Sequence, residues 1–209
     1  MEKALEWCRL PDWKKLPKLM LETSLTAKAL TPGKRVEALL EELIDAQDFS
    51  CLKMPFAAVA TDLRTGEKVV MDRGDVLSAV RASMSIPGVF PPVERDGRIL
   101  VDGQLVDPVP VSLCRAMGAD VVIAVDINPP NDPSGMKPYP KFNMVDILTS
   151  TLNILNRKIT DRVLAEDRPE VLICPKVGGV LALDFRHAGR LVEIGRQAVD
   201  DAENLCASE

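Results

Sequence analysis

The sequence predicts an α/β fold with a partly parallel sheet. Residues 54–63 and 120–127 are apolar without alternating polar residues, which is typical of strands buried on both faces. Residues 98–101 favour a short strand, and residues 108–117 predict a helix that begins with proline and ends at Gly118. A strand, a helix and a strand in this order indicate a βαβ unit, whose two strands run parallel.

The composition suits one globular domain over residues 1–209. The chain has 46% hydrophobic residues, enough to bury a core. No apolar run approaches the roughly 18 residues of a membrane span, and the first residues lack the pattern of a secretory signal. We therefore expect a cytoplasmic protein. Peripheral membrane contact is a second expectation, from a basic cluster near two tryptophans, although a solvated helix face explains the same residues: Trp7, Trp13, Lys14, Lys15 and Lys18.

Charge and cysteine usage exclude other classes of function. The net charge of −5 gives no general basic field, so we expect no nucleic-acid partner. The five cysteines show no C-x-x-C spacing, and His187 is the single histidine of the sequence. We expect neither a metal site nor a cofactor.

The first half of the chain divides into five expected elements. Residues 1–26 are expected to be partly helical, and residues 34–46 carry apolar side chains at helical spacing. The strand over 54–63 is expected to return through residues 68–71, with a Thr-Gly turn between them. Asp75 is the expected N-cap of a helix that must end before Pro87-Gly88.

The last third begins with a proline-rich loop, residues 129–142. This loop either covers a site or is a surface connection. Residues 143–209 are expected to supply a long amphipathic helix, a short strand over 171–175 and a closing helix over 186–206. His187 lies in the first turn of that helix, where local hydrogen bonding is its usual role.

Asp102 is the candidate functional residue. It follows the short strand 98–101, and Gly103 lets the backbone turn sharply behind it. This places Asp102 at the carboxyl end of a strand, where ligands and catalytic groups gather in α/β sheets. The alternative is an ordinary turn aspartate that caps a loop.

The surrounding residues resemble the bacterial patatin-like phospholipase family. The resemblance is carried by V-R-A-S-M-S-I-P-G-V-F-P-P-V (residues 80–93), V-D-G (101–103) and P-V-P (108–110), and extends through residues 56–67 and 115–126. It is strongest over residues 54–128 and weaker over 183–199. It implies a three-layer fold with a largely parallel central sheet, of which this chain is expected to lack the N-terminal strand or strands and the nucleophile-elbow helix.

The resemblance also implies chemistry. The family hydrolyses fatty acyl esters and phospholipids with a Ser-Asp dyad, without a cofactor, and its aspartate lies in an Asp-Gly-Gly or Asp-Gly-Ala motif. That motif maps onto Asp102, Gly103 and Gln104, so Gln104 departs from the small third residue and either crowds the pocket or points away. Physically, burial should raise the pKa of the aspartate and make it a better base for a serine hydroxyl.

The nucleophile of such a dyad is not found in these 209 residues. No serine lies in a G-x-S-x-G elbow, which the resemblance places before Met1. Ser83 and Ser85 precede a proline turn, so helix-end hydrogen bonding is their expected role. Three hypotheses follow: part of a lipid acyl hydrolase that contributes the base and is inactive alone, a non-catalytic lipid- or protein-binding module, or a truncated gene product. Loss of central strands would also expose a sheet edge that favours self-association.

Overall fold

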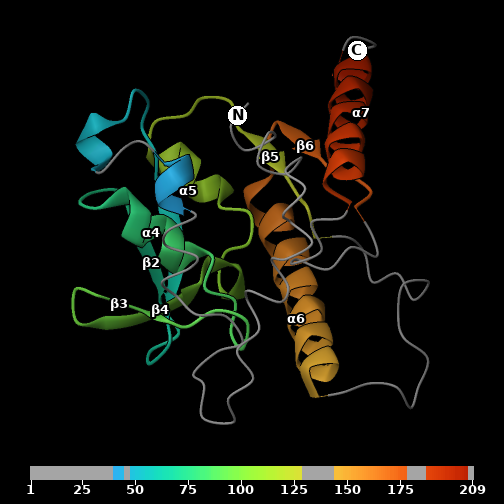
Figure 1. Ribbon diagram of the computed structural model, residues 1–209. Coiled ribbons are helices and arrows are strands. Elements are labelled where there is room, and N and C mark those ends of the chain that lie inside the picture. The colour runs from blue at the N-terminus through green and yellow to red at the C-terminus, as the bar shows by residue number, and fades with distance from the viewer. Residues whose placement is uncertain (1–39, 45–47, 129–143, 178–186, 207–209) are drawn as a thin grey trace. The chain divides into compact units, whose positions relative to one another are not determined.

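A computed structural model describes residues 40–44, 48–128, 144–177 and 187–206 (Figure 1). These residues form two compact units, which meet in the sequence between Asp107 and Pro108. The expected N-terminal helical region with its basic cluster and the loop 129–142 lie outside the described residues. Within the described part of the chain, no helix has both the length and the apolar character needed to cross a bilayer.

The first unit is built on a hairpin that the sequence predicts. Strands β1 (Ala58–Asp62) and β2 (Lys68–Met71) pair antiparallel, and Ala58 lies opposite Met71. The connecting turn needs Gly66, whose φ of 73° lies in the left-handed region. All five residues of β1 are buried, as the run of apolar residues without polar alternation predicts.

A second hairpin completes this sheet. Strands β3 (Val93–Arg95) and β4 (Arg98–Asp102) are joined by Asp96 and Gly97, whose φ values are 51° and 73°. Two successive positive φ angles are the signature of the two-residue type I′ turn, for which Asp-Gly is a favoured pair. The strand order is β2-β1-β4-β3, and every pairing is antiparallel.

Helix α4 (Val76–Ser83) packs against this sheet. Asp75 caps it, because its carboxylate accepts a hydrogen bond from the backbone N–H of Ser78, as expected. The core between helix and sheet contains alanines from α4 and β1 together with Leu100 of β4. A short 3-10 turn, η2 (Phe49–Cys51), adds Phe49 to the same core. The buried core contains Phe49, Ala58, Ala60, Met71, Val76, Ala79, Ala82 and Leu100.

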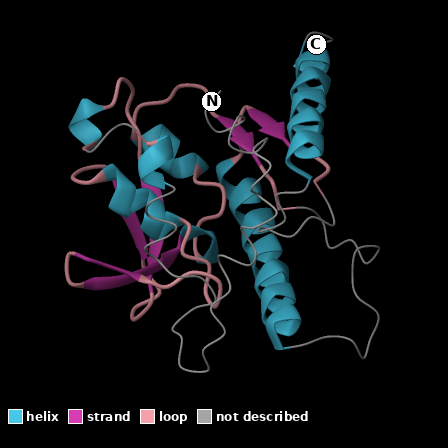
Figure 2. Cartoon of the chain, in the orientation of Figure 1, coloured by secondary structure: helices cyan, strands magenta, loops and turns pink. Residues whose placement is uncertain are grey.

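The second unit contains α5 (Val111–Ala116), β5 (Ile123–Val125), α6 (Met144–Asp167), β6 (Val171–Ile173) and α7 (Ala188–Cys206) (Figure 2). Strands β5 and β6 pair parallel, with Ile123 opposite Val171, and the long helix α6 lies between them in the sequence. This is the β-α-β order that a parallel pair requires. Its core contains Val109, Val111, Val122 and Ala124, with Leu164 of α6 packed against them.

The α/β class is confirmed, but the expected parallel sheet is observed only in part. Within the described residues, parallel pairing is confined to β5 and β6. For the βαβ unit expected over residues 98–127, the described residues show no pairing between its two strands: β4 pairs with β1 and β3, and β5 pairs with β6. The short turns at Gly66 and at Asp96-Gly97 make β1–β2 and β3–β4 antiparallel, because parallel strands need a longer crossover connection.

Candidate active site

Asp102 is the last residue of β4, as the sequence predicts. It lies opposite Ala60 on the buried strand β1 and is 6% exposed. A carboxyl group is among the groups least often buried, so its position at this strand end needs a structural or chemical reason.

The backbone of Asp102 is held from both sides. Its N–H donates to the carbonyl oxygen of Ser85 at 3.0 Å. Its own carbonyl oxygen accepts a hydrogen bond from the hydroxyl of Thr61 at 2.8 Å, and Thr61 is itself buried. Sequence reasoning did not identify these two positioning residues. A threonine within an otherwise apolar buried strand was the available signal for Thr61, because a buried hydroxyl needs a partner.

Gly103 is required by close packing. A Cβ atom at this position would lie 2.2 Å from the carbonyl oxygen of Val59 and 2.7 Å from its carbonyl carbon. Both are backbone atoms of β1 and cannot move aside cheaply. Glycine therefore lets the chain pass directly over β1 and enter the 3-10 turn η3 (Gly103–Leu105).

The carboxylate of Asp102 caps this turn. Its Oδ1 accepts a hydrogen bond from the backbone N–H of Gln104 at 2.8 Å. Gln104 therefore contributes through its backbone, a contact that any non-proline residue at the third motif position can supply. Oδ2 of Asp102 accepts no hydrogen bond from any described residue.

Burial raises the pKa of Asp102 from 3.8 to about 6, and the hydrogen bond from the N–H of Gln104 opposes this rise. No charged group contributes to the shift. Two other buried aspartates of the unit are paired with cations: Oδ2 of Asp62 lies 3.6 Å from Nη1 of Arg98, and Oδ2 of Asp107 lies 3.0 Å from Nζ of Lys68. The site therefore holds a carboxylate that is more basic than usual, and its Oδ2, which accepts no hydrogen bond from the described part of the chain, can accept a proton.

Ser85 does not have the exposure of a nucleophile. It is fully buried, and its hydroxyl donates to the carbonyl oxygen of Arg81 at 2.8 Å while accepting from Nη1 of Arg81 at 2.7 Å. The expected helix-end hydrogen bonding is thus confirmed for Ser85. Ser83, the other serine considered, is half-buried on α4.

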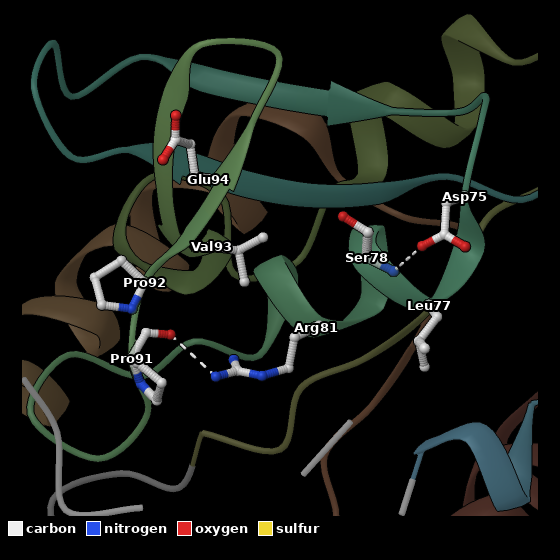
Figure 3. A pocket seen from close by; sticks show the side chains of 8 residues that line it. All are labelled: Asp75, Leu77, Ser78, Arg81, Pro91, Pro92, Val93 and Glu94. Atoms are coloured by element: carbon white, nitrogen blue, oxygen red, sulfur yellow. Dashed lines mark hydrogen bonds between the residues drawn. The ribbon is translucent and has the colours of Figure 1, made fainter. Parts of the chain in front are cut away.

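One cavity of about 390 Å³ lies beside α4. Figure 3 shows its eight lining residues, with Arg81 reaching from α4 to the carbonyl oxygen of Pro91. Asp102 is not among them, so this cavity and the candidate base are separate features. Its walls carry the carboxylates of Asp75 and Glu94, which do not suit an acyl chain.

In the second unit, a buried aspartate is paired with a partly exposed arginine. Asp126 directly follows β5, and its Oδ2 accepts a hydrogen bond from Nη1 of Arg157 on α6 at 2.8 Å. The same Arg157 nitrogen donates to the carbonyl oxygen of Asn128 at 2.9 Å. This pair ties α6 to the end of β5. Within the described residues, no group of three potential metal-ligating side chains comes together.

Comparison with known proteins extends these observations. A family model for patatin-like phospholipases matches residues 3–115. An uncharacterized NTE family protein of Mycobacterium tuberculosis is 37% identical over 109 residues, which are 52% of this chain and 30% of that protein. Another from the same organism is 32% identical over 193 residues, covering 84% of this chain and 33% of that protein.

A mammalian relative is more distant. Patatin-like phospholipase domain-containing protein 7 of Rattus norvegicus is 29% identical over 127 residues, which are 60% of this chain and 9% of that protein. The chain thus spans at most 33% of the length of each of these relatives. Because the family model covers more than half of the chain, including Asp102, the chain belongs to the patatin-like phospholipase family.

Proposed function

We propose that this chain supplies the aspartate base of a lipid acyl hydrolase that cleaves fatty acyl esters, including those of phospholipids, with a Ser-Asp dyad. The observation that carries the proposal is the state of Asp102: a buried carboxyl group at a strand end, with a raised pKa and with no hydrogen bond to Oδ2 from the described residues. Membership of the family and the name of the rat relative, a patatin-like phospholipase domain-containing protein, support the choice of substrate class.

The reaction proceeds through an acyl-enzyme. Oδ2 of Asp102 accepts the hydroxyl proton of the serine while the serine oxygen bonds to the ester carbonyl carbon. The bond to the leaving alcohol then breaks, and protonated Asp102 returns the proton to that alcohol. In the second half, Asp102 takes a proton from water, the resulting hydroxide attacks the acyl carbon, and the serine oxygen leaves with the proton.

The serine must come from sequence outside these 209 residues, since none of their serines lies in a G-x-S-x-G elbow. An aspartate without its nucleophile has no covalent route, so we expect the isolated chain to show no ester hydrolysis and no acylation burst.

The test uses the longer polypeptide that joins this chain to an upstream segment bearing G-x-S-x-G. Its hydrolysis of a p-nitrophenyl acyl ester and of phosphatidylcholine vesicles is measured for the parent and for two variants. Asp102→Asn should lower kcat by at least about 100-fold, a typical loss for a missing general base. Asp96→Asn is the matched control, because Asp96 lies exposed in the β3–β4 turn, where asparagine also tolerates a positive φ.

Activity of the Asp102→Asn variant equal to that of the control would refute the assignment. The alternative function, a non-catalytic lipid- or protein-binding module, takes its place if the joined polypeptide hydrolyses neither substrate but binds the vesicles. The observation behind this alternative is the missing G-x-S-x-G in the present sequence.

A further inference from the structure

We propose that Arg81 is a positioning residue for Asp102: its guanidinium fixes Ser85, and the carbonyl oxygen of Ser85 in turn holds the backbone N–H of Asp102. This inference rests on the proposed function only in taking Asp102 as the base. The hydrogen bonds themselves are independent of that role.

Arg81 occupies an unusual position for an arginine. It lies on α4 and is 2% exposed, although its side chain carries a permanent charge. Nη1 donates to the hydroxyl of Ser85 at 2.7 Å, and Nη2 donates to the carbonyl oxygen of Pro91 at 3.1 Å. The guanidinium also lies over the ring of Phe90, 5.6 Å from its centroid. One side chain thus binds both ends of the segment 85–91.

Ser85 links this cluster to Asp102. Its hydroxyl returns a hydrogen bond to the backbone of Arg81 at 2.8 Å, so the side chain is held as donor and as acceptor by the same residue. Its carbonyl oxygen accepts the N–H of Asp102 at 3.0 Å. Because Ser85 is fully buried, water cannot replace these bonds without opening the unit.

On one side of β4, no neighbouring strand among the described residues holds the backbone of Asp102. Strand β3 begins at Val93, opposite Leu100, and therefore does not extend to Asp102. On that side of β4, the carbonyl oxygen of Ser85 takes the place of a strand partner. The prolines of the segment that follows Ser85 have no N–H to donate, and the N–H groups of Val89 and Phe90 donate within the turn to the carbonyl oxygen of Ile86, while Arg81 holds the carbonyl oxygen of Pro91.

Arg81 acts through geometry and not through its charge. The pKa of Asp102 is raised by burial and lowered by the N–H of Gln104, with no contribution from a cation. Two ion pairs of the same sheet unit join Asp62 with Arg98 and Asp107 with Lys68. Loosening the Arg81–Ser85 contact should therefore displace the carboxylate and admit water to it.

The first test uses the 209-residue chain and needs no nucleophile. In Ser85→Ala and Arg81→Lys, the amide of Asp102 should exchange with solvent about 10-fold faster, as expected when one hydrogen bond is weakened. The pKa of the Asp102 carboxyl, measured by carbon NMR, should fall from about 6 toward 3.8. The amide of Leu63, which donates to Ile99 within the same sheet, serves as internal reference. Ser83→Ala and Arg64→Lys are the matched controls, on half-buried and exposed residues respectively.

The second test measures kinetics in the joined polypeptide. Ser85→Ala should lower kcat by about 10- to 100-fold with little change in KM, because a misplaced base slows proton transfer without altering substrate binding. Arg81→Lys should retain more activity than Ser85→Ala, since the lysine ammonium can still donate to either Ser85 or Pro91.

Amide exchange, the pKa of Asp102 and kcat together distinguish a wrong positioning role from a wrong proposed function. Equal acceleration of the Leu63 and Asp102 amides, or an unchanged pKa of Asp102, would overturn the positioning role and leave only a general effect on stability. The role is also overturned if Asp102→Asn abolishes hydrolysis while Ser85→Ala leaves kcat unchanged. If Asp102→Asn is fully active, Asp102 is not the base and the proposed function is wrong. Arg81 then has no catalytic residue to position, and the kinetics of this one variant are enough to show it.

Discussion

Replacing Asp102 with asparagine removes a carboxyl group that the fold keeps out of water, and its effect on stability should depend on pH. The pKa of this group is 3.8 when solvated and about 6 in the folded chain. Below about 3.8, the folded and unfolded chains both carry the proton, so burial of the charge costs nothing. Between the two values only the folded chain holds the proton, and rising pH destabilises the fold. Above about 6 the cost is complete.

The size of this effect follows from the two pKa values. The difference between 3.8 and about 6, at 1.36 kcal/mol per pKa unit, corresponds to about 3 kcal/mol. Asparagine cannot ionise, and its Oδ1 can still accept the N–H of Gln104. The Asp102→Asn variant should therefore match the parent near pH 4 and exceed its free energy of unfolding by about 3 kcal/mol at pH 7 and above.

The assay is urea unfolding between pH 4 and pH 8, followed through the amide signals of β1 and β4, which report on the unit that holds Asp102. Asp96→Asn removes the same charge from the exposed β3–β4 turn and should show no such pH-dependent gain. A stability gain for Asp102→Asn that is independent of pH, or largest near pH 4, would refute the account of Asp102 as a buried and destabilised carboxylate. Catalytic groups held at a cost to stability are common in enzymes.

Two further substitutions test the packing that surrounds these residues. Gly103→Ala should lower the free energy of unfolding of the first unit by about 3 kcal/mol in urea, because the new Cβ would lie 2.2 Å from the carbonyl oxygen of Val59. The control is Gly195→Ala on α7, where the new Cβ meets no atom within 4 Å and the change should be neutral or stabilising. Equal effects of the two substitutions would contradict the close approach of Gly103 to β1. In the second unit, Arg157→Met should lower the free energy of unfolding by about 3 kcal/mol, since it leaves the buried Asp126 without its arginine partner. Adding Asp126→Asn to this variant should restore part of the lost stability. If it restores none, loss of the ion pair is not the cause.

Local signals in the sequence predicted the elements of the first unit well. The Thr-Gly turn predicted the β1–β2 hairpin, and Asp75 was identified as a helix cap from residue type and position alone. The Asp96-Gly97 pair is an equally clear turn signal for the β3–β4 hairpin. Such signals are readable because turn and cap chemistry depends on a few adjacent residues.

Pairing between distant strands could not be read in the same way. The strand-helix-strand order over residues 98–127 fitted a parallel unit, yet β5 pairs with β6, which follows another helix. An apolar run predicts that a strand is buried, but it does not predict which other strand it pairs with.

The candidate site was also predictable only in part. Asp102 was found from its place after a strand and before a glycine, and its position is confirmed. The contacts that hold it were not predicted, because Thr61 and Ser85 lie 41 and 17 positions away in the sequence and act through single hydrogen bonds. The reason for Gly103 was expected to be a sharp turn and is instead the carbonyl of Val59.

The central claim, that Asp102 is the base of an acyl hydrolase, is tested most directly by the pH dependence of kcat/KM for ester hydrolysis in the joined polypeptide. A base whose pKa is about 6 should give a rate that rises about tenfold per pH unit below that value and is level above it. The Asp102→Asn variant should lose both the rate and this profile. A rate that is level from pH 4 to pH 8, or an unchanged profile in Asp102→Asn, would contradict the claim.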